Sequence, residues 1–483
     1  MTKKINSVRW ISALLAAFLC CAGISPAQTR GDEKEKKVDE LFSPYKTKDS
    51  PGAAVVVVQD GKIILQKEYG LADLESGLPI RASTVFPVGS VSKQFTGYAI
   101  LLLEQQGRLK LTDDIRKYLP ELPEFMSRMT IRHILNHTSG LREQENLFAM
   151  CGITTADVFG NADSMEFLKR QKEWNFPPGD EIEYCNSGFI LAAEIIARIT
   201  GKSMREWTFE NIFKPIGMND TCFNDDGSRI IKNMAQSYFL PPGTNELAKG
   251  ILSSSNVGST GVITTSTDMA KWLIHFGDPR VGGAAVMNKM LTDTCTTSQG
   301  ELVDYSYGIA VTKNNGLKAN FHSGSEAGYR AFDVFYPEYK FGVAVLSNFL
   351  KINAQDLGFK IAKIFLENQM EPPAVMKNQR QDPTDPQAES GKKYVLLGKD
   401  FGQYAGSYFS DELETQYVIV LRNDSLVMKH IRNAEIILTP DSLDHFTGEY
   451  PMVSLHFIRD AENRIAGFRV SSARVRNLLF NKK

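Results

Sequence analysis

The chain has 483 residues, a formal net charge of −1 and 42% hydrophobic residues, a composition typical of a soluble globular protein with room for two or three domains. Charged residues make up 23% of the chain and form no basic block, which argues against nucleic-acid binding. A core of this size is stable without a metal or disulfides. Length and composition therefore exclude a disordered or disulfide-dependent class.

The first 27 residues have the pattern of a signal peptide. Positively charged residues precede an apolar segment at 10–24, and Ser25-Pro26-Ala27 fits a cleavage site. The apolar segment is short for a membrane span, although a retained N-terminal anchor is the alternative. We expect an exported protein, periplasmic or secreted. Its mature chain loses three positive charges, which changes the formal net charge from −1 to −4.

Cysteines and histidines do not form a metal-binding pattern. Four cysteines follow the signal segment without a Cys-x-x-Cys pair: Cys151, Cys185, Cys222 and Cys295. Export permits disulfides, but four cysteines allow three pairings and the sequence does not choose among them. His133 and His137 have helical spacing but lack the glutamate of a His-Glu-x-x-His site. We therefore expect no metal and no other cofactor.

Strands are predicted near both ends of the first domain, with helices between them and a closing helix after the last strand. Strands at both ends with helices between them predict one sheet built from both ends, and so an α/β or α+β domain over residues 34–370. The turn residues Asp60-Gly61 and Pro337-Glu338 each join two strands of a hairpin. The expected elements are strands at 53–58 and 63–68, a helix at 90–106, strands at 330–335 and 341–347, and a helix at 356–368.

Composition changes after residue 370. Residues 371–393 are rich in Pro, Gln, Asp and Lys and have the character of a linker. Residues 394–483 contain short apolar segments separated by turn residues, which predicts a small all-β domain, an antiparallel barrel or sandwich. The expected strands are 404–408, 417–421, 425–430, 453–458 and 465–470.

The segment Ser90-Val91-Ser92-Lys93 is the candidate catalytic motif. Residues three apart lie on the same face of a helix, so the amine of Lys93 is placed to take the hydroxyl proton of Ser90. A serine hydroxyl is a weak nucleophile until such a base activates it. Partial burial and a lowered pKa would suit Lys93 to that role. The backbone N–H of Ser90, at a helix start, is free to stabilise an oxyanion.

Five segments, in this order, resemble the serine β-lactamase and penicillin-binding-protein superfamily, in its class C and CubicO-like branch. The resemblance covers about residues 35–368 and implies a mixed sheet flanked by helices, beside an all-helical lobe, with the site between them. The C-terminal barrel resembles lipocalin-like modules of some family peptidases. The segments are 86–93 (FPVGSVSK), 131–141 (IRHILNHTSGL), 176–186 (FPPGDEIEYCN), 212–218 (IFKPIGM) and 261–272 (GVITTSTDMAKW).

The resemblance implies roles for residues of the later motifs. Tyr184 resembles the tyrosine that passes a proton to the leaving group, and a cation such as Lys93 would make it useful at neutral pH. Asn186 resembles the residue that binds the substrate amide and Lys93. The N–H of Ser325 corresponds to the second oxyanion donor. Cys185 is expected to be buried and to point away from the site.

The third motif, His322-Ser323-Gly324, departs from the family pattern, which commonly begins with lysine. A histidine with its ordinary pKa near 6.5 is mostly neutral at pH 7, which argues against efficient β-lactam hydrolysis. We therefore expect substrates that carry a carboxylate to improve, relative to neutral ones, below about pH 6.5. Gly324 is expected to let substrate approach the strand, and Ser323 to line it.

Together these motifs predict an exported serine hydrolase that forms an acyl-enzyme on a peptide, amide or ester, most like a CubicO-type D-aminopeptidase or DD-peptidase. The alternatives are a short-chain esterase or β-lactamase on the same fold, and a β-lactam-binding sensor without turnover. We expect no nucleic-acid partner and no stable membrane span after signal cleavage. Self-association through the barrel stays open. Substrate choice depends on loops such as residues 143–163, whose shape the sequence does not reveal.

Overall fold

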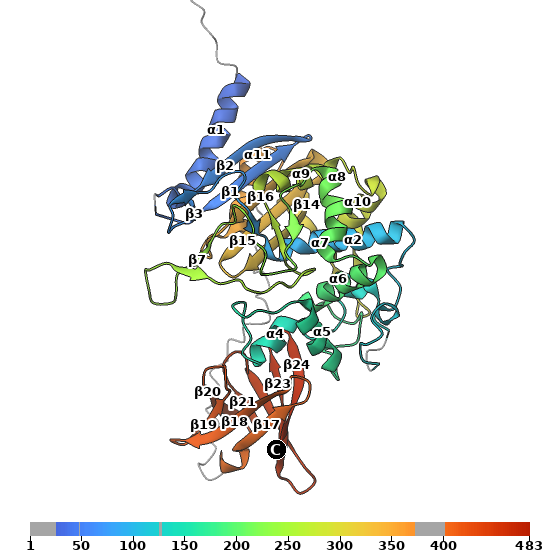
Figure 1. Ribbon diagram of the computed structural model, residues 1–483, viewed down its shortest axis with the longest axis vertical. Coiled ribbons are helices and arrows are strands. Elements are labelled where there is room, and N and C mark those ends of the chain that lie inside the picture. The colour runs from blue at the N-terminus through green and yellow to red at the C-terminus, as the bar shows by residue number, and fades with distance from the viewer. Residues whose placement is uncertain (1–25, 48, 125–127, 372–400) are drawn as a thin grey trace, which may run out of the picture.

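The computed structural model describes residues 26–47, 49–124, 128–371 and 401–483, with side chains from residue 33 onward. Most of the predicted signal peptide and nearly all of the predicted linker lie outside these residues. Figure 1 shows a larger domain of sheet and helices and, beside α4 and α5, a barrel formed by the C-terminal part of the chain. Among the described residues, no helix is both long and apolar enough to cross a bilayer.

A seven-stranded antiparallel sheet forms the centre of the first domain, in the order β12-β13-β14-β15-β16-β1-β2. Strand β1 lies between β2 and β16, so Val56 stands opposite both Gln66 and Ala344. Both ends of the domain therefore build one sheet, and the predicted mixed α/β fold is confirmed. The strands are β1 (Ala53–Gln59), β2 (Lys62–Tyr69), β12 (Tyr305–Ser306), β13 (Ile309–Asn314), β14 (Leu317–Glu326), β15 (Tyr329–Tyr336) and β16 (Phe341–Ser347).

Helices cover both faces of the sheet, which explains why β1 is apolar at consecutive positions. Val56 and Val58 pack into the core that contains Trp272 of α9. Val55 and Val57 face the opposite way, into the core that contains Ile361 of α11. Each fully buried valine of this kind contributes roughly 1.5–3 kcal/mol. One face is covered by α1 (Pro26–Leu41) and α11 (Ala354–Leu366), the other by α2 (Ser92–Gln105), α9 (Ser266–Gly277) and α10 (Gly283–Thr292).

A helical lobe lies beside the sheet. Its central helix α6 is buried along most of its length and ends at Gly201, whose φ of 71° suits glycine. The helices of the lobe are α3 (Ile131–Leu135), α4 (Gln144–Met150), α5 (Asn161–Arg170), α6 (Asn186–Thr200), α7 (Met204–Thr208) and, after a π-helical turn at Phe209–Phe213, α8 (Lys214–Ile216). The short strands are β3 (Leu71–Asp73), β4 (Leu78–Pro79), β5 (Phe86–Pro87), β6 (Cys222–Phe223), β7 (Ser237–Phe239), β8 (Ala248–Gly250), β9 (Val262–Thr264), β10 (Cys295–Thr296) and β11 (Leu302–Val303).

The C-terminal domain is a closed antiparallel barrel of eight strands, which confirms the predicted all-β class. Three strands were not predicted: β21 has only three residues, β20 contains Pro440, and polar residues interrupt the alternation in β24. The first strand begins at Gly406, because Tyr404 ends a short 3-10 helix. The strands are β17 (Gly406–Ser410), β18 (Thr415–Arg422), β19 (Ser425–Lys429), β20 (Ile436–Ser442), β21 (His445–Thr447), β22 (Ser454–Arg459), β23 (Ile465–Ser472) and β24 (Val475–Lys482).

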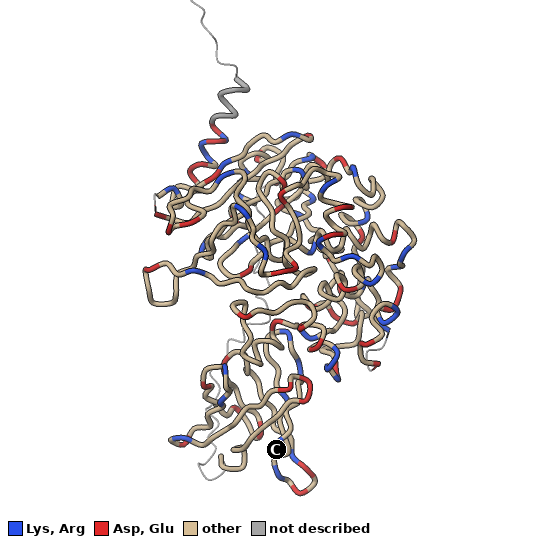
Figure 2. Tube along the Cα trace, in the orientation of Figure 1, with Lys and Arg blue, Asp and Glu red and all other residues tan. Residues whose placement is uncertain are grey.

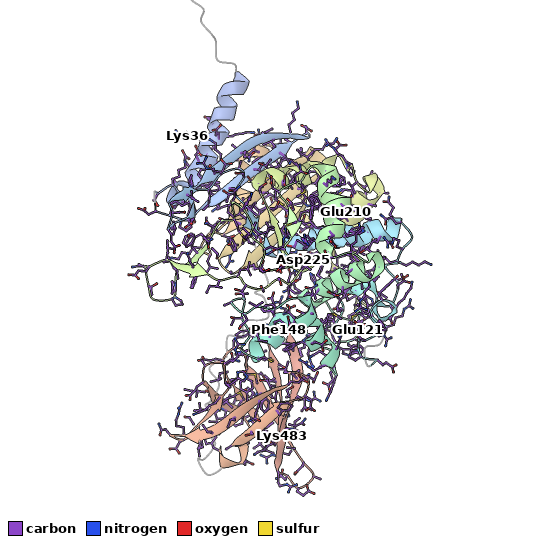
Figure 3. The ribbon with its side chains drawn as sticks, viewed as in Figure 1. Lys36, Glu121, Phe148, Glu210, Asp225 and Lys483 are labelled. Carbon is purple, nitrogen blue, oxygen red and sulfur yellow. The ribbon has the colours of Figure 1, made fainter. Side chains whose placement is uncertain are left out.

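The barrel joins the helical lobe through an apolar core and a set of ion pairs. Leu147 and Met150 of α4 are fully buried in the core of the barrel. Arg142, also buried, donates from Nη1 to Oε2 of Glu412 over 2.7 Å. Figure 2 shows charges of both signs where the domains meet, and Figure 3 places Phe148 on the side of the lobe that faces the barrel. The two domains therefore share a buried interface.

Candidate active site

Ser90 lies in a 3-10 turn, Gly89–Val91, directly before α2. Gly89 has a φ of 50°, a left-handed conformation that glycine adopts readily. Strand β14 passes so close to this turn that a Cβ on Gly324 would lie 1.9 Å from the carbonyl oxygen of Val88. Gly324 therefore makes room for the nucleophile turn of the protein itself. The expected approach of substrate to Gly324 stays a prediction.

The same contact brings a backbone N–H of β14 beside the turn. A Cβ on Gly89 would lie 2.8 Å from the nitrogen of Ser325, and one on Gly324 would lie 3.2 Å from the nitrogen of Ser90. The two predicted oxyanion donors are thus neighbours. Side chains alternate along a strand, so Ser323 and Ser325 face away from Gly324, and both are exposed. Their hydroxyl groups are not part of the cluster around Ser90.

Lys93 lies on the next turn of the helix and is fully buried. Its Nζ is 3.0 Å from Oγ of Ser90, 2.6 Å from Oδ1 of Asn186 and 2.9 Å from the carbonyl oxygen of Ser259. Burial lowers the pKa of Lys93 to about 7, against the opposing effect of the Glu143 charge. Near neutral pH, part of the protein therefore carries Lys93 as a free amine. In that form Nζ can accept the Ser90 proton along the existing contact.

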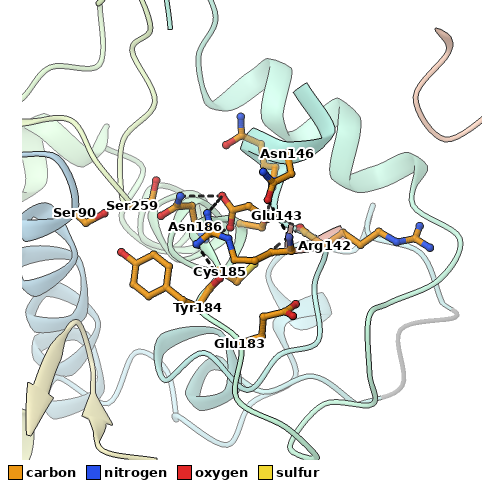
Figure 4. Close-up of polar contacts among 12 residues, drawn as sticks. Ser90, Arg142, Glu143, Asn146, Glu183, Tyr184, Cys185, Asn186 and Ser259 are labelled. Carbon is orange, nitrogen blue, oxygen red and sulfur yellow. Dashed lines mark hydrogen bonds and ion pairs between the residues drawn. The ribbon is translucent and has the colours of Figure 1, made fainter. Parts of the chain in front are cut away.

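The side chain of Tyr184 lies beside the nucleophile Ser90. Figure 4 shows Tyr184 and Asn186 directed toward Ser90, whereas Glu183 points away. The centroid of the Tyr184 ring is 4.3 Å from the centroid of the His137 ring and 4.8 Å from Nζ of Lys93. Burial raises the pKa of Tyr184, although a hydrogen bond with Ser90 lowers it. Tyr184 therefore stays protonated at neutral pH and is able to donate a proton.

Asn186 begins α6 and is oriented by a carboxylate that sequence reasoning missed. Its backbone N–H donates to Oε2 of Glu143 over 2.6 Å, and its Nδ2 donates to Oε1 over 2.8 Å. Because Nδ2 is committed to Glu143, Oδ1 faces Lys93. The Glu143 side chain is fully buried. The sequence places Glu143 only at the start of a loop expected to set substrate choice, and no spacing rule connects it with Asn186. In the structure that range is partly helical, with α4 and the start of α5.

His322 is neutral and fully engaged by the protein. Its Nδ1 donates to the carbonyl oxygen of Ser323 over 2.6 Å, so its Nε2 accepts from the hydroxyl of Tyr305 over 2.7 Å. Burial, with a smaller effect of Lys93, lowers the pKa of His322 to about 3. His322 therefore does not gain charge between pH 5 and 8. The predicted improvement of carboxylate substrates below pH 6.5 loses its basis.

The remaining predicted residues have structural contacts. His133 closes a capping box at the start of α3, and His137 accepts the N–H of Cys185 over 3.1 Å. Cys185 is buried, with its Sγ 3.4 Å from the carbonyl oxygen of Leu141. All four described cysteines are free thiols. Within the described part of the chain, no three His, Cys, Asp or Glu side chains gather as a metal site would require.

Two further carboxyl groups lie within electrostatic reach of Lys93. Burial raises the pKa of Glu326, at the end of β14, to about 7, and the charge of Glu145 adds to this. Glu145, in the first turn of α4, is exposed to solvent, and partial desolvation together with the charge of Glu143 raises the pKa of its carboxyl group. A cavity of about 420 Å³ adjoins Glu326 and Tyr329. A cation beside these carboxyl groups would relieve their mutual repulsion.

One side chain of the site comes from the barrel. Nη1 of Arg474 donates to the carbonyl oxygen of Tyr184 over 3.2 Å, and its Nη2 is 3.9 Å from Oε1 of Glu143. Nothing in the sequence signals this contact, because Arg474 is an ordinary turn residue between two apolar segments. Only the docking of the barrel brings it to the site.

Comparison with known proteins finds relatives in sequence and in fold. The D-aminopeptidase of Brucella anthropi is 29% identical over 323 residues, which cover 65% of this chain and 59% of that relative. The octameric penicillin-binding protein homologue from Pyrococcus abyssi has a TM-score of 0.61 and 22% identity, over 93% of this chain and 99% of that chain. The D-amino acid amidase from Ochrobactrum anthropi SV3, complexed with L-phenylalanine amide, has a TM-score of 0.60 and 20% identity, over 70% and 99%.

These likenesses differ in what they establish. Both solved structures are less than 25% identical and show the fold alone, and the chain spans about three fifths of the curated relative. The family profile described as Beta-lactamase matches residues 38–360, which hold Ser90, Lys93, Tyr184 and Asn186. With that match and the contact between Ser90 and Lys93, the chain belongs to the beta-lactamase family, as a serine hydrolase fold related to D-aminopeptidases.

Proposed function

We propose that the protein hydrolyses the amide bond that follows an amino-terminal residue in peptides or amino acid amides, through an acyl-enzyme on Ser90. The observation that carries this proposal is the 3.0 Å contact between Ser90 Oγ and Lys93 Nζ. The names of the relatives, D-aminopeptidase and D-amino acid amidase, support residues of D configuration as substrates.

The reaction follows from the positions of the groups. Ser90 Oγ attacks the carbonyl carbon while its proton moves to Lys93, and the N–H groups of Ser90 and Ser325 stabilise the oxyanion. Tyr184 gives its proton to the departing amine nitrogen as the C–N bond breaks, and regains one through Lys93. Water then attacks the acyl ester, and the acid leaves as Ser90 recovers its proton.

The carboxyl groups within electrostatic reach of Lys93 support a substrate with a free amine. Glu145 and Glu326 are carboxyl groups, and a bound ammonium would keep both ionised. His322, by contrast, supplies no positive charge for a substrate carboxylate. A charged hydrogen bond contributes about 1.5–3 kcal/mol, which corresponds to roughly 10- to 150-fold in kcat/KM. We therefore place the substrate ammonium beside Glu145 and Glu326.

The test is a substrate panel with matched variants. D-amino acid p-nitroanilides with a free amine, the same compounds N-acetylated, p-nitrophenyl esters and nitrocefin are compared at pH 7.5. We expect the free-amine amides to be the best substrates and N-acetylation to lower kcat/KM by roughly 10- to 150-fold. Glu145→Gln should remove most of that difference, whereas Glu166→Gln, at an exposed pair with Lys169, should not.

Other outcomes of the panel identify the alternatives. Turnover of esters alone would assign a short-chain esterase, and turnover of nitrocefin would assign a β-lactamase. A stable penicillin adduct on Ser90 without turnover would assign a sensor. Equal rates for free and N-acetylated amides would contradict the ammonium site.

We propose in addition that the protein is exported, on the pattern of residues 1–27. The amino-terminal sequence of protein expressed in a bacterial host tests this directly. A mature chain that starts near Gln28 supports export with cleavage. A chain that still begins at Met1 in the membrane fraction supports the retained anchor instead.

A further inference from the structure

The tip of one barrel hairpin enters the active site. Strands β23 and β24 are joined by the two-residue turn Ala473-Arg474, flanked by the pair Ser472 and Val475. Ala473 has a φ of 48°, which residues other than glycine, asparagine and aspartate seldom adopt. Backbone strain of this kind persists only where the surroundings hold it in place. The contacts of the turn with the catalytic domain provide that hold.

Three hydrogen bonds fix the backbone of Arg474 to the catalytic domain. Its carbonyl oxygen accepts from the N–H of Glu143 over 3.1 Å and from Nδ2 of Asn175 over 2.9 Å. Its own N–H donates to Oδ1 of Asn146 over 3.3 Å. The turn is therefore tied to the loop before α6 and to the start of α4.

The side chain of Arg474 spans two groups of the site. Besides its contacts with Glu143 and the carbonyl oxygen of Tyr184, its guanidinium carbon lies 5.4 Å from the centre of the Tyr184 ring. A cation above a ring and a hydrogen bond to the carbonyl of the same residue restrict its movement. Arg474 thus contacts Tyr184 at both backbone and side chain.

The buried carboxylate of Glu143 explains why a cation is needed here. A buried charge is costly unless a countercharge accompanies it. Lys93 and Arg474 are two cations in electrostatic reach of Glu143, and they have opposite consequences for the reaction. If Lys93 alone balanced Glu143, it would have to stay protonated and would be no base. The permanent charge of an arginine removes that requirement.

We propose that Arg474, supplied by the barrel, is a positioning residue of the reaction: it neutralises Glu143 and holds Tyr184, so that Lys93 is left free to act as the base. The barrel is then a part of the active site. The inference rests on the serine–lysine chemistry of the proposed function. It does not depend on the identity of the substrate.

Several charged and titratable groups face Lys93 and set its ionisation together with Arg474. Glu143 and Glu145 raise the pKa of Lys93, and the guanidinium of Arg474 lowers it. Loss of Arg474 should therefore raise the pKa of Lys93. The rise in reaction rate on the acid side of the pH–rate profile should then occur at higher pH. The facing groups are Glu143, Glu145, His137, Tyr184, Cys185, His322, Glu326 and Arg474.

The experiment measures the rate at which a fluorophosphonate probe labels Ser90 between pH 5 and 10, in the full-length protein. We expect the pKa that governs the acid side of the pH–rate profile to rise by about one unit or more in Arg474→Met, so that labelling at pH 7 is about fivefold slower or more. The labelling rate of Arg474→Met should recover toward pH 10. Arg474→Lys should return the pH–rate profile part of the way to that of the unaltered protein. Arg469→Met is the matched control, because Arg469 lies on the same hairpin and pairs with Glu173 at the domain junction.

Three results decide the inference. No labelling of the unaltered protein, relative to Ser90→Ala, would contradict the proposed function and this inference with it. Labelling with the same pH profile in Arg474→Met and Arg469→Met would overturn the role of Arg474 alone. Because Arg474→Met risks misfolding, it is repeated in a Glu143→Gln background. We expect the pH shift to become smaller there, because only the direct repulsion between Arg474 and Lys93 remains. An equal shift in both backgrounds would overturn the neutralisation of Glu143 by Arg474.

Discussion

The catalytic domain and the barrel bury their polar groups in different places. In the catalytic domain Lys93, Glu143 and Asn186 lie in the interior, around the reactive hydroxyl. The interior of the barrel is instead packed by rings such as those of Phe457 and Phe468, whose centroids are 5.4 Å apart. Among the described residues of the barrel, the buried charged side chain is that of Glu412, at the junction with the helical lobe. One domain therefore uses its core for chemistry and the other uses its core only for rigidity.

This difference shows where to look for the function of the barrel. An interior filled by aromatic side chains gains stability from packing, and its ring pairs add to that. The rigid barrel can then hold a hairpin tip at a fixed place in the neighbouring domain. Its contribution is made at the rim, through the turn at Arg474 and the buried pair between Arg142 and Glu412.

The sharpest test of the comparison is the nucleophile itself. If the covalent chemistry takes place on Ser90, Ser90→Ala should lower kcat/KM by roughly 10⁴-fold or more, as loss of the nucleophile does in other serine hydrolases. Intact-mass measurement after the fluorophosphonate probe should show one adduct, absent from the variant. Ser92→Ala should keep the adduct, because the Ser92 hydroxyl is buried and accepts the N–H of Val262. An adduct that maps to Ser92 would contradict the assignment.

The proton-transfer groups should show the next largest effect. Lys93→Ala is expected to lower kcat/KM by at least about 10²-fold, the usual size of general-base effects, and Tyr184→Phe by a similar factor with the fold retained. Steady-state kinetics and circular dichroism of both variants check this. Near wild-type turnover in both would exclude this mechanism and point to another base.

The junction offers a prediction on stability. Glu412 is buried and accepts from Arg142 and from the N–H of Lys172 over 2.8 Å. Glu412→Gln leaves the buried Arg142 with only its longer pair, 3.6 Å, to the half-exposed Glu173. We therefore expect the free energy of unfolding to fall by up to about 3–5 kcal/mol. Asp411→Asn, at an exposed pair with Lys172, should cost about 1 kcal/mol or less. Urea unfolding of the full chain measures both, and equal losses would mean that the junction does not depend on the buried pair.

The smallest expected effect concerns His322. Because burial holds its pKa near 3, the ratio of kcat/KM for carboxylate-bearing over neutral substrates should stay flat from pH 5.5 to 8. In the folded protein His322 takes up a proton only near pH 3, whereas in the unfolded chain it does so near pH 6.5. Its effect is therefore on stability: the free energy of unfolding falls as pH falls from about 6.5 toward 3. A ratio that rises below pH 6.5 and disappears in His322→Gln would show that His322 charges after all.

Sequence reasoning reached the groups that local spacing brings together. Ser90 and Lys93 share a helix face, and the family motif added Tyr184 and Asn186. Sequence reasoning did not identify Glu143 or Arg474, because their roles depend on how a loop and a second domain pack against the motif. The same limit applies to Gly324, whose neighbour is the turn at Val88 from a distant part of the chain, and to His322, whose burial changes its pKa. Contacts between distant segments leave no periodic pattern in the chain.

The central position of β1 has a consequence for how the protein comes to its native state. Its partner β16 is made almost 300 residues later, so Val56 pairs with Gln66 early but meets Ala344 only near the end of synthesis of the domain. Contacts of such long range slow folding. Until β16 arrives, the run Ala53 to Val58 has an open edge and two uncovered apolar faces, which favours aggregation. We therefore expect the yield of folded protein to depend on chaperones or low temperature more than on the stability of the finished fold.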